Sequence, residues 1–104
     1  MSEELEIQRW DESEPPNRKK MREELLDEGF HGIHTFRDAP GTTYAEHQHD
    51  YIEVRWVLKG ELIFGVGGKE YHLKPGDRID MPAHLLHDAK VDPSKGAAYV
   101  CASK

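Results

Sequence analysis

From residue 30 onward, apolar and polar residues alternate in short runs that are separated by turn-forming residues. Period-two alternation in short runs is the pattern of half-buried β-strands. Glycine, proline and aspartate mark the breaks, and Gly67-Gly68 is a typical two-residue hairpin turn. We predict strands over residues 30–37, 43–47, 51–58, 61–66, 69–73, 78–81, 84–91 and 97–102. Many short strands at close spacing are typical of an all-β sandwich or barrel.

The part of the chain before these strands has a helical pattern. Asn17 is suited to cap a short helix that ends before Gly29. Met21 and Leu25 lie four residues apart and, with Leu26 beside them, form the predicted buried side of this helix. Because its last turn is acidic and opposes the helix dipole, we expect the helix to depend on packing against the barrel.

The chain begins with an acidic stretch in which Leu5 and Ile7 alternate with polar residues. This stretch is either a short strand, paired with the barrel edge or with a partner subunit, or a flexible tail. Trp10 favours packing, because a tryptophan is costly to expose to water. The predicted domain organisation is therefore an N-terminal extension, residues 1–29, that packs on a barrel domain, residues 30–104.

Composition limits the partners of the chain. A formal net charge of −6 argues against a general nucleic-acid-binding protein, which needs clustered lysine and arginine. No apolar run is long enough to cross a bilayer, and the N-terminus has no hydrophobic signal region. Cys101 is the only cysteine, which rules out an intrachain disulfide and fits a reducing compartment. We expect a cytoplasmic protein with no nucleic-acid or membrane partner.

Candidate metal ligands lie in the stretch from Gly41 to Gly60. His47, His49 and Glu53 all occupy odd positions, so an extended backbone would direct their side chains to one face. Two imidazoles and a carboxylate are suitable ligands for a divalent metal ion. His87, on a later predicted strand, is the best candidate for a fourth ligand.

Three nitrogens and one oxygen around an octahedral ion would leave two positions open to water, substrate or dioxygen. An open site of this kind is suited to catalysis. The expected cofactor is one divalent transition metal ion, and iron, manganese, nickel, copper, cobalt and zinc all accept such ligands.

Arg55 is the other informative residue of this stretch. It lies two residues from Glu53 and is predicted to face inward, where its guanidinium could bind a carboxylate or phosphate of a small substrate. The alternatives are a structural salt bridge to Glu53 or another interior acid, or an outward turn at the barrel mouth. Tyr44 and Tyr99 either line the same interior or belong to the core. We expect Cys101 to be a small buried residue and not a nucleophile.

These residues carry a family resemblance. The run from Gly41 through His47, His49 and Glu53 to Gly60 resembles the first conserved motif of the cupin superfamily. The run from Gly76 to Val91 resembles the second motif, with Pro82 and the metal-ligand position, His87. The resemblance covers roughly residues 30 to 102. It departs from the pattern at His84, where glycine is usual, and at Val91, where asparagine is usual.

The resemblance implies a cupin fold, which is a double-stranded β-helix or jelly-roll barrel, here with a short N-terminal helix. It also implies that His47, His49, Glu53 and His87 bind the metal ion, and small proteins of this kind commonly form homodimers. His84 lies near the metal-bearing strand and is either a general acid or base or a residue that caps the loop.

We therefore predict a metal-binding cupin protein that acts on a small polar or anionic metabolite. The expected reaction is that of a dioxygenase, with isomerisation or decarboxylation as alternatives, and Arg55 and His84 are its candidate catalytic residues. The competing hypothesis is a non-catalytic module that binds a metabolite or a metal ion, since the same fold serves both classes.

Overall fold

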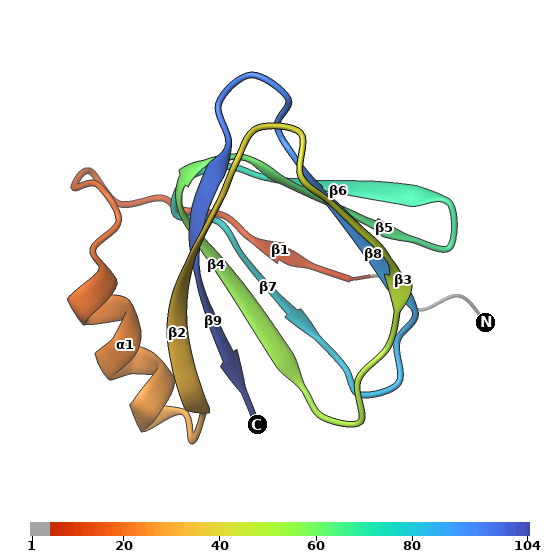
Figure 1. Cartoon of the computed structure of the whole chain (residues 1–104). Coiled ribbons are helices and arrows are strands. Elements are labelled where there is room, and N and C mark those ends of the chain that lie inside the picture. Colours follow the sequence, from red (N-terminus) through yellow and green to blue (C-terminus); the bar gives the residue numbers. More distant parts are fainter. Residues whose placement is uncertain (1–4) are drawn as a thin grey trace.

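The computed structural model describes residues 5–104, and the first four residues of the predicted N-terminal extension lie outside it. Figure 1 shows a barrel of strands with one helix on its side. Its elements are β1 (Ile7–Gln8), α1 (Arg18–Asp27), β2 (His31–Asp38), β3 (Thr43–His47), β4 (Glu53–Gly60), β5 (Leu62–Val66), β6 (Lys69–Leu73), β7 (Arg78–Met81), β8 (His87–Val91) and β9 (Ala97–Ser103).

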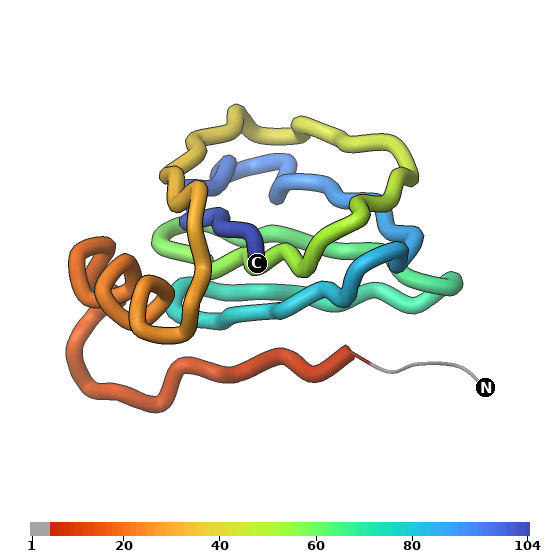
Figure 2. The backbone as a smooth tube through the Cα atoms, turned by 90° about the horizontal axis from the view of Figure 1, so that it is seen from below, coloured from red at the N-terminus to blue at the C-terminus, as the bar shows by residue number. Residues whose placement is uncertain are grey.

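The described strands form two antiparallel sheets. The strand order is β1-β7-β4-β9-β2 in the first sheet and β3-β8-β5-β6 in the second. Figure 2 shows the chain passing repeatedly between two layers, with the N-terminal segment running along the outside. This arrangement confirms the predicted all-β barrel with a short N-terminal helix, and the strand at the predicted hairpin, β5, pairs directly with β6.

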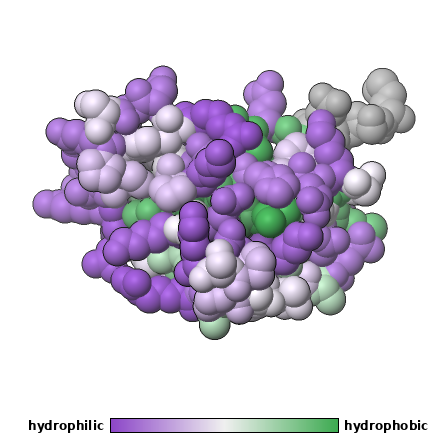
Figure 3. Space-filling model, turned by 90° about the horizontal axis from the view of Figure 1, so that it is seen from above, coloured by the Kyte–Doolittle hydropathy of each residue, from purple (hydrophilic) through white to green (hydrophobic). Residues whose placement is uncertain are grey.

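Alternation along the strands creates the main core between the sheets. Val57 of β4, Leu62 and Phe64 of β5, and Ile79 of β7 are buried there. The end of the barrel that carries the β2–β3 and β8–β9 loops is mostly hydrophilic, as Figure 3 shows. The apolar side chains are thus concentrated in the interior, where their removal from water stabilises the fold.

Helix α1 covers the outer face of the first sheet and forms a second core. Met21 and Leu25 are fully buried against Val54, Trp56 and Val100. The apolar outer surface at Trp56 is therefore covered by this helix. The predicted N-cap is confirmed, because the Asn17 side chain accepts a hydrogen bond from the Lys20 N–H at 3.1 Å. Among residues 5–104, no helix is long and apolar enough to cross a membrane.

The prediction for Leu26 is wrong, since this side chain is 51% exposed. Residues four apart share a helix face, so Met21 and Leu25 point the same way. Leu26 follows Leu25 directly and is rotated by about 100° around the axis, away from the sheet.

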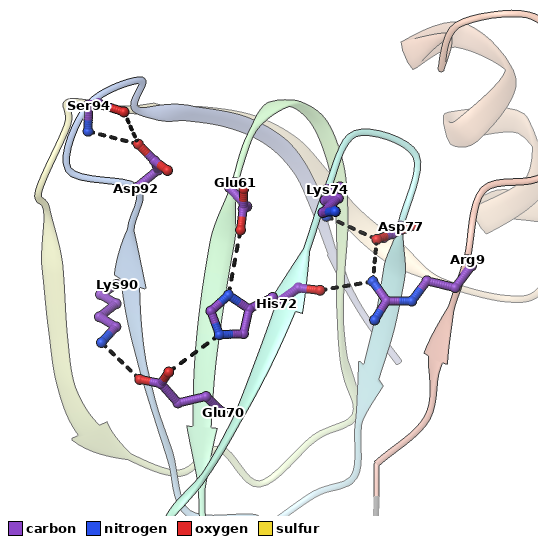
Figure 4. A network of polar contacts seen from close by, with 9 residues as sticks. All are labelled: Arg9, Glu61, Glu70, His72, Lys74, Asp77, Lys90, Asp92 and Ser94. Carbon is purple, nitrogen blue, oxygen red and sulfur yellow. Dashed lines mark hydrogen bonds and ion pairs between the residues drawn. The ribbon is translucent and has the colours of Figure 1, made fainter.

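Residues 5–10 pack along the barrel edge. Of the two alternatives left open by the sequence, a short strand or a flexible tail, the described residues form the strand. Ile7 pairs with Ile79 in an antiparallel β1–β7 ladder. Beyond it, Arg9 forms an ion pair with Asp77 at 2.7 Å and also bonds the His72 carbonyl at 2.9 Å (Figure 4). Asp77 in turn accepts hydrogen bonds from the backbone N–H groups of Trp10 and Lys74. These contacts fix the segment on the barrel.

One turn requires glycine for two separate reasons. Gly60 has φ +73°, which side chains rarely adopt, and a Cβ atom there would lie 1.9 Å from the Gly96 carbonyl oxygen. Gly67 has a similar φ of +57°, but a Cβ atom there would meet nothing within 4 Å. Alanine substitutions at the two positions therefore distinguish the cost of backbone strain, present at both, from the cost of a steric clash, present only at Gly60.

We expect Gly67→Ala to lower the free energy of unfolding by about 1 kcal/mol through backbone strain alone. Gly60→Ala should cost about 3 kcal/mol or more, because the β4–β5 and β8–β9 turns must separate to admit the methyl group. Urea denaturation of both variants measures the difference, and equal losses would contradict the close approach at Gly60.

Candidate metal centre

The centre is built on the pairing of β3 with β8. His47, the last residue of β3, and His87, the first residue of β8, are directly opposite each other in the antiparallel ladder. Side chains of such cross-strand pairs lie close together on one face of a sheet. The two imidazole ring centroids are accordingly 4.4 Å apart.

His49 joins this pair from the loop that connects β3 to β4. Its ring centroid lies 4.9 Å from that of His47 and 5.6 Å from that of His87. The His49 carbonyl accepts a hydrogen bond from the His84 N–H at 2.6 Å, and the Tyr51 ring stacks on the imidazole at 4.9 Å. Both contacts restrict a loop residue that otherwise has no ladder to hold it.

The three histidines can together hold a metal ion. One ring nitrogen from each of His47, His49 and His87 lies within 4.8 Å of the others. The Nδ1 atoms of His47 and His87 donate to the carbonyl oxygens of Ala45 and Leu85, at 2.7 and 2.9 Å. Because a carbonyl can only accept, these bonds fix the tautomer and leave each Nε2 lone pair available to a metal ion.

The protonation state of His87 favours ligation. Burial lowers the pKa of this imidazole below its ordinary value, and the nearby His47 and His49 add to the effect. The bond to the Leu85 carbonyl and the negative charge of Glu53 oppose this lowering of the pKa. The ring is therefore neutral at neutral pH, which is the form that binds metal ions.

Glu53 lies beside the histidine cluster. Its Oε1 atom is 3.4 Å from His49 Nε2 and 2.8 Å from Arg55 Nη2. Within the described residues, His49 Nε2 and Glu53 Oε1 are both buried without a hydrogen-bond partner, so the Arg55 contact is an ion pair that lacks hydrogen-bond geometry. Buried polar atoms normally have partners. A cation between these two atoms would supply one, so the residues present fit a metal ion.

The side chains of His47, His49 and Glu53 do not lie on one extended strand, so the predicted reason for their convergence is wrong. Strand β3 ends at His47 and β4 begins at Glu53, and these strands belong to different sheets. The side chains converge because the intervening loop turns the chain from one sheet to the other. The three histidines form the close cluster, and ligation by Glu53 stays a prediction.

The histidine cluster opens into a cavity of about 240 Å³ between the sheets. Its walls are mainly apolar and aromatic. They are formed by Phe36, Tyr44, His47, His49, Arg55, Leu62, Phe64, His87, Ala89, Tyr99 and Cys101. A largely apolar cavity with a few polar groups is the usual form of a small-molecule site.

Arg55 and His84 occupy different positions relative to this cavity. Arg55 lines it, but its guanidinium contacts Glu53 and donates to the Val54 carbonyl at 3.2 Å. His84 is exposed and does not line the cavity, and its φ of +66° explains why glycine is usual there. Its backbone links two loops, and catalytic roles for both side chains stay predictions.

Tyr44, Tyr99 and Cys101 all line the cavity. Burial raises the pKa of the Cys101 thiol to about 12, so it is protonated at neutral pH, in agreement with the predicted inert residue. Sequence reasoning missed Phe36 and Asp38 of β2. Their spacing of two residues, which places them on one face of the strand, was the available signal, but it does not identify which face of an edge strand meets a cavity.

Comparison with known proteins identifies the fold and the family. The cupin domain model matches residues 34–103, which is most of the chain. A cupin superfamily protein from Desulfitobacterium hafniense aligns over 99% of this chain and 79% of its own, at 16% identity and a TM-score of 0.63. A cupin-like protein from Thermotoga maritima aligns over 69% of this chain and 55% of its own, at 22% identity and a TM-score of 0.65.

Two curated proteins match parts of the sequence. Acireductone dioxygenase from Bacillus pumilus is 40% identical over 47 residues, which are 40% of this chain and 27% of that protein. Quercetin 2,3-dioxygenase from Bacillus subtilis is 32% identical over 53 residues, or 50% of this chain and 16% of that protein. The matched region is thus less than a third of either relative. The family match extends over residues 34–103, more than half of the chain, and the chain belongs to the cupin-domain family.

Proposed function

We propose that this protein is a metal-dependent enzyme that acts on a small polar metabolite, with a dioxygenase reaction as the leading candidate. The observation that carries the proposal is the cluster of His47, His49 and His87 at one end of an apolar cavity. The partial similarity to two dioxygenases supports the reaction class. Isomerisation and decarboxylation are the other reactions that such a centre would support.

The three histidines would hold the ion through ring nitrogens, with Glu53 as the proposed fourth ligand. A divalent metal ion bound there would supply Lewis-acid chemistry or, if redox-active, a site for dioxygen activation. The backbone carbonyls of Ala45 and Leu85 keep two of the imidazoles in the ligating tautomer.

The remaining residues of the cavity would bind and orient the substrate. Leu62 and Phe64 are buried and line the wall, so they would exclude water from the reacting groups. Arg55 is the proposed positioning residue, since its guanidinium lies in the wall and also contacts Glu53. His84 is the proposed acid or base, which would require its exposed side chain to turn toward the cavity.

A specific observation favours the competing function, a non-catalytic binding module. The Arg55 guanidinium and the Tyr44 and Tyr99 hydroxyls, which all line the cavity, already have partners within the protein. None of them is a free acid or base. Binding without turnover would need no such group. The homodimer and the cytoplasmic location predicted from the sequence also remain proposals.

We expect His87→Ala to weaken Co²⁺ binding by about 100-fold or more, because it removes one of three converging nitrogens. Titration of the cobalt absorption bands in competition with a chelator measures the affinity. His72→Ala is the matched control, since this exposed histidine lies on β6 and contacts Glu61 and Glu70. Equal affinities of wild type and His87→Ala would contradict the proposed centre.

The enzyme and the binding module differ in turnover. Protein purified without a metal-binding tag and reconstituted with Fe²⁺, Mn²⁺ or Ni²⁺ should consume oxygen with at least one member of a panel of enediols and catechols. Oxygen uptake should vanish in a His47→Ala, His49→Ala double variant. A panel compound that raises the melting temperature but is never consumed would favour the binding module, and uptake that persists without metal would contradict the enzyme hypothesis.

A further inference from the structure

A second polar cluster, formed by Asp38, Tyr44 and Tyr99, adjoins the same cavity as the histidines. The Asp38 carboxylate accepts hydrogen bonds from the Tyr44 hydroxyl, at 2.9 Å to each carboxylate oxygen. It also accepts one from the Tyr99 hydroxyl at 2.5 Å. Asp38 itself does not line the cavity, so it acts on the interior through the two tyrosines that do.

These bonds decide what the tyrosine hydroxyls can offer a ligand. A hydroxyl has one proton, and in both tyrosines that proton is committed to Asp38. Burial and the bond to Asp38 raise the pKa of Tyr99, so its hydroxyl stays protonated. The phenolic oxygens therefore retain only lone pairs, and they can accept a further hydrogen bond but not donate one.

Strand β3 contributes a residue to each polar cluster of the cavity. Tyr44 is its second residue and His47 its last, and the irregularity of the ladder between them allows both side chains, three residues apart, to line the same cavity. In Figure 1, β3 runs from the loop that joins it to β2 down to the loop that joins it to β4. The cavity of about 240 Å³ has room for a ligand with a single aromatic ring.

The walls of the cavity suit a ring. Phe36 lies with its ring nearly parallel to Tyr99, at a centroid distance of 6.1 Å and an interplanar angle of 25°. Phe64 and Leu62 line the cavity as well. Phe36 and Tyr44 are 47% and 40% exposed, so they mark the opening through which a ligand would enter.

The charges around the cavity disfavour an anionic ligand. Arg55 supplies a guanidinium to the lining, and this group is already paired with the Glu53 carboxylate at 2.8 Å, while its Cζ atom lies 5.9 Å from the centroid of the Tyr99 ring. Asp38 contributes a negative charge behind Tyr44 and Tyr99, whose hydroxyls present only acceptors. A carboxylate placed against them would face this charge with no hydroxyl proton to bind it, and like charges repel.

We propose that Asp38, Tyr44 and Tyr99 form an acceptor subsite that selects a neutral, single-ring ligand with a hydroxyl donor and disfavours carboxylates. Asp38 is a positioning residue in this arrangement, because it orients the two hydroxyls. The inference rests on the proposed function in that it takes this cavity as the substrate site. It narrows the predicted substrate class from polar or anionic molecules to neutral hydroxyl donors.

Three probes of similar size test the selection: phenol, which can donate, anisole, which cannot, and benzoate, which is an anion. Their affinities for chelator-treated, ¹⁵N-labelled protein follow from chemical-shift titration. We expect phenol to bind about fivefold more tightly than either of the others, the factor that one hydrogen bond supplies. Tyr44→Phe should reduce this preference to less than twofold, and Tyr71→Phe, a tyrosine outside the cavity, should leave it unchanged.

The Asp38→Asn variant tests whether Asp38 orients the two tyrosine hydroxyls or only supports the local structure. An amide can donate to the tyrosine oxygens and thereby release their protons toward the cavity. The variant should therefore bind benzoate more tightly relative to phenol, which loss of structure would not produce. Anisole or benzoate binding as tightly as phenol to wild type, no saturable binding of any probe, or an unchanged preference in Tyr44→Phe would overturn the subsite.

The same experiment separates this inference from the proposed function. The probes are measured in metal-free protein, so a failure of the histidines to bind metal would leave the phenol preference intact. Conversely, Tyr44→Phe should bind Co²⁺ as tightly as wild type, because Tyr44 is not part of the histidine cluster. Loss of cobalt affinity in Tyr44→Phe would contradict the claim that the tyrosine subsite acts independently of the histidine cluster.

Discussion

The antiparallel pairing of β3 with β8 determines the geometry of the candidate centre. It places His47 opposite His87, and the backbone carbonyls two residues before each histidine hold the two imidazoles in one tautomer. His49 then needs only the short loop after β3 to complete the cluster. A shift of this ladder by one residue would turn one histidine to the other face of the sheet, and the three-histidine cluster would not form.

The cavity that adjoins this cluster has two chemically different ends. The histidines, with Glu53 and Arg55, offer ligand atoms and compensating charges at one end. The bonded Asp38, Tyr44 and Tyr99 offer only acceptors at the other end. Arg55 lies between Glu53 and the ring of Tyr99, and mainly apolar side chains form the rest of the wall. They lower the local dielectric, so each polar contact with a ligand would be stronger than in water. The two ends together would fix the orientation of a bound molecule.

The sequence predicted most of the fold because alternation, turn residues and the helix cap are local signals. It also identified the three clustered histidines, through the motif that carries the family resemblance. The reason first given for their convergence, a single extended strand, was wrong, because the pattern does not show where a chain leaves one sheet for another. Leu26 was misassigned because an apolar residue beside a buried pair need not share their helix face.

The acceptor cluster could not be predicted in the same way. Asp38, Tyr44 and Tyr99 come from three different strands, and only the tertiary arrangement of β2, β3 and β9 brings their polar atoms together. The pair between Arg55 and Glu53 was one of several alternatives for Arg55, and spacing could not choose among them. Side-chain partners across a barrel depend on packing, which a single sequence does not specify.

The most direct test of the account is a crystal structure of metal-loaded protein with anomalous diffraction data collected at the absorption edge of the metal. The account predicts one strong anomalous peak in each chain, within coordination distance of Nε2 of both His47 and His87 and of a ring nitrogen of His49. Whether Glu53 contacts the same peak would establish the number of protein ligands. A histidine cluster without a peak, or a peak bound elsewhere on the chain, would contradict the central claim.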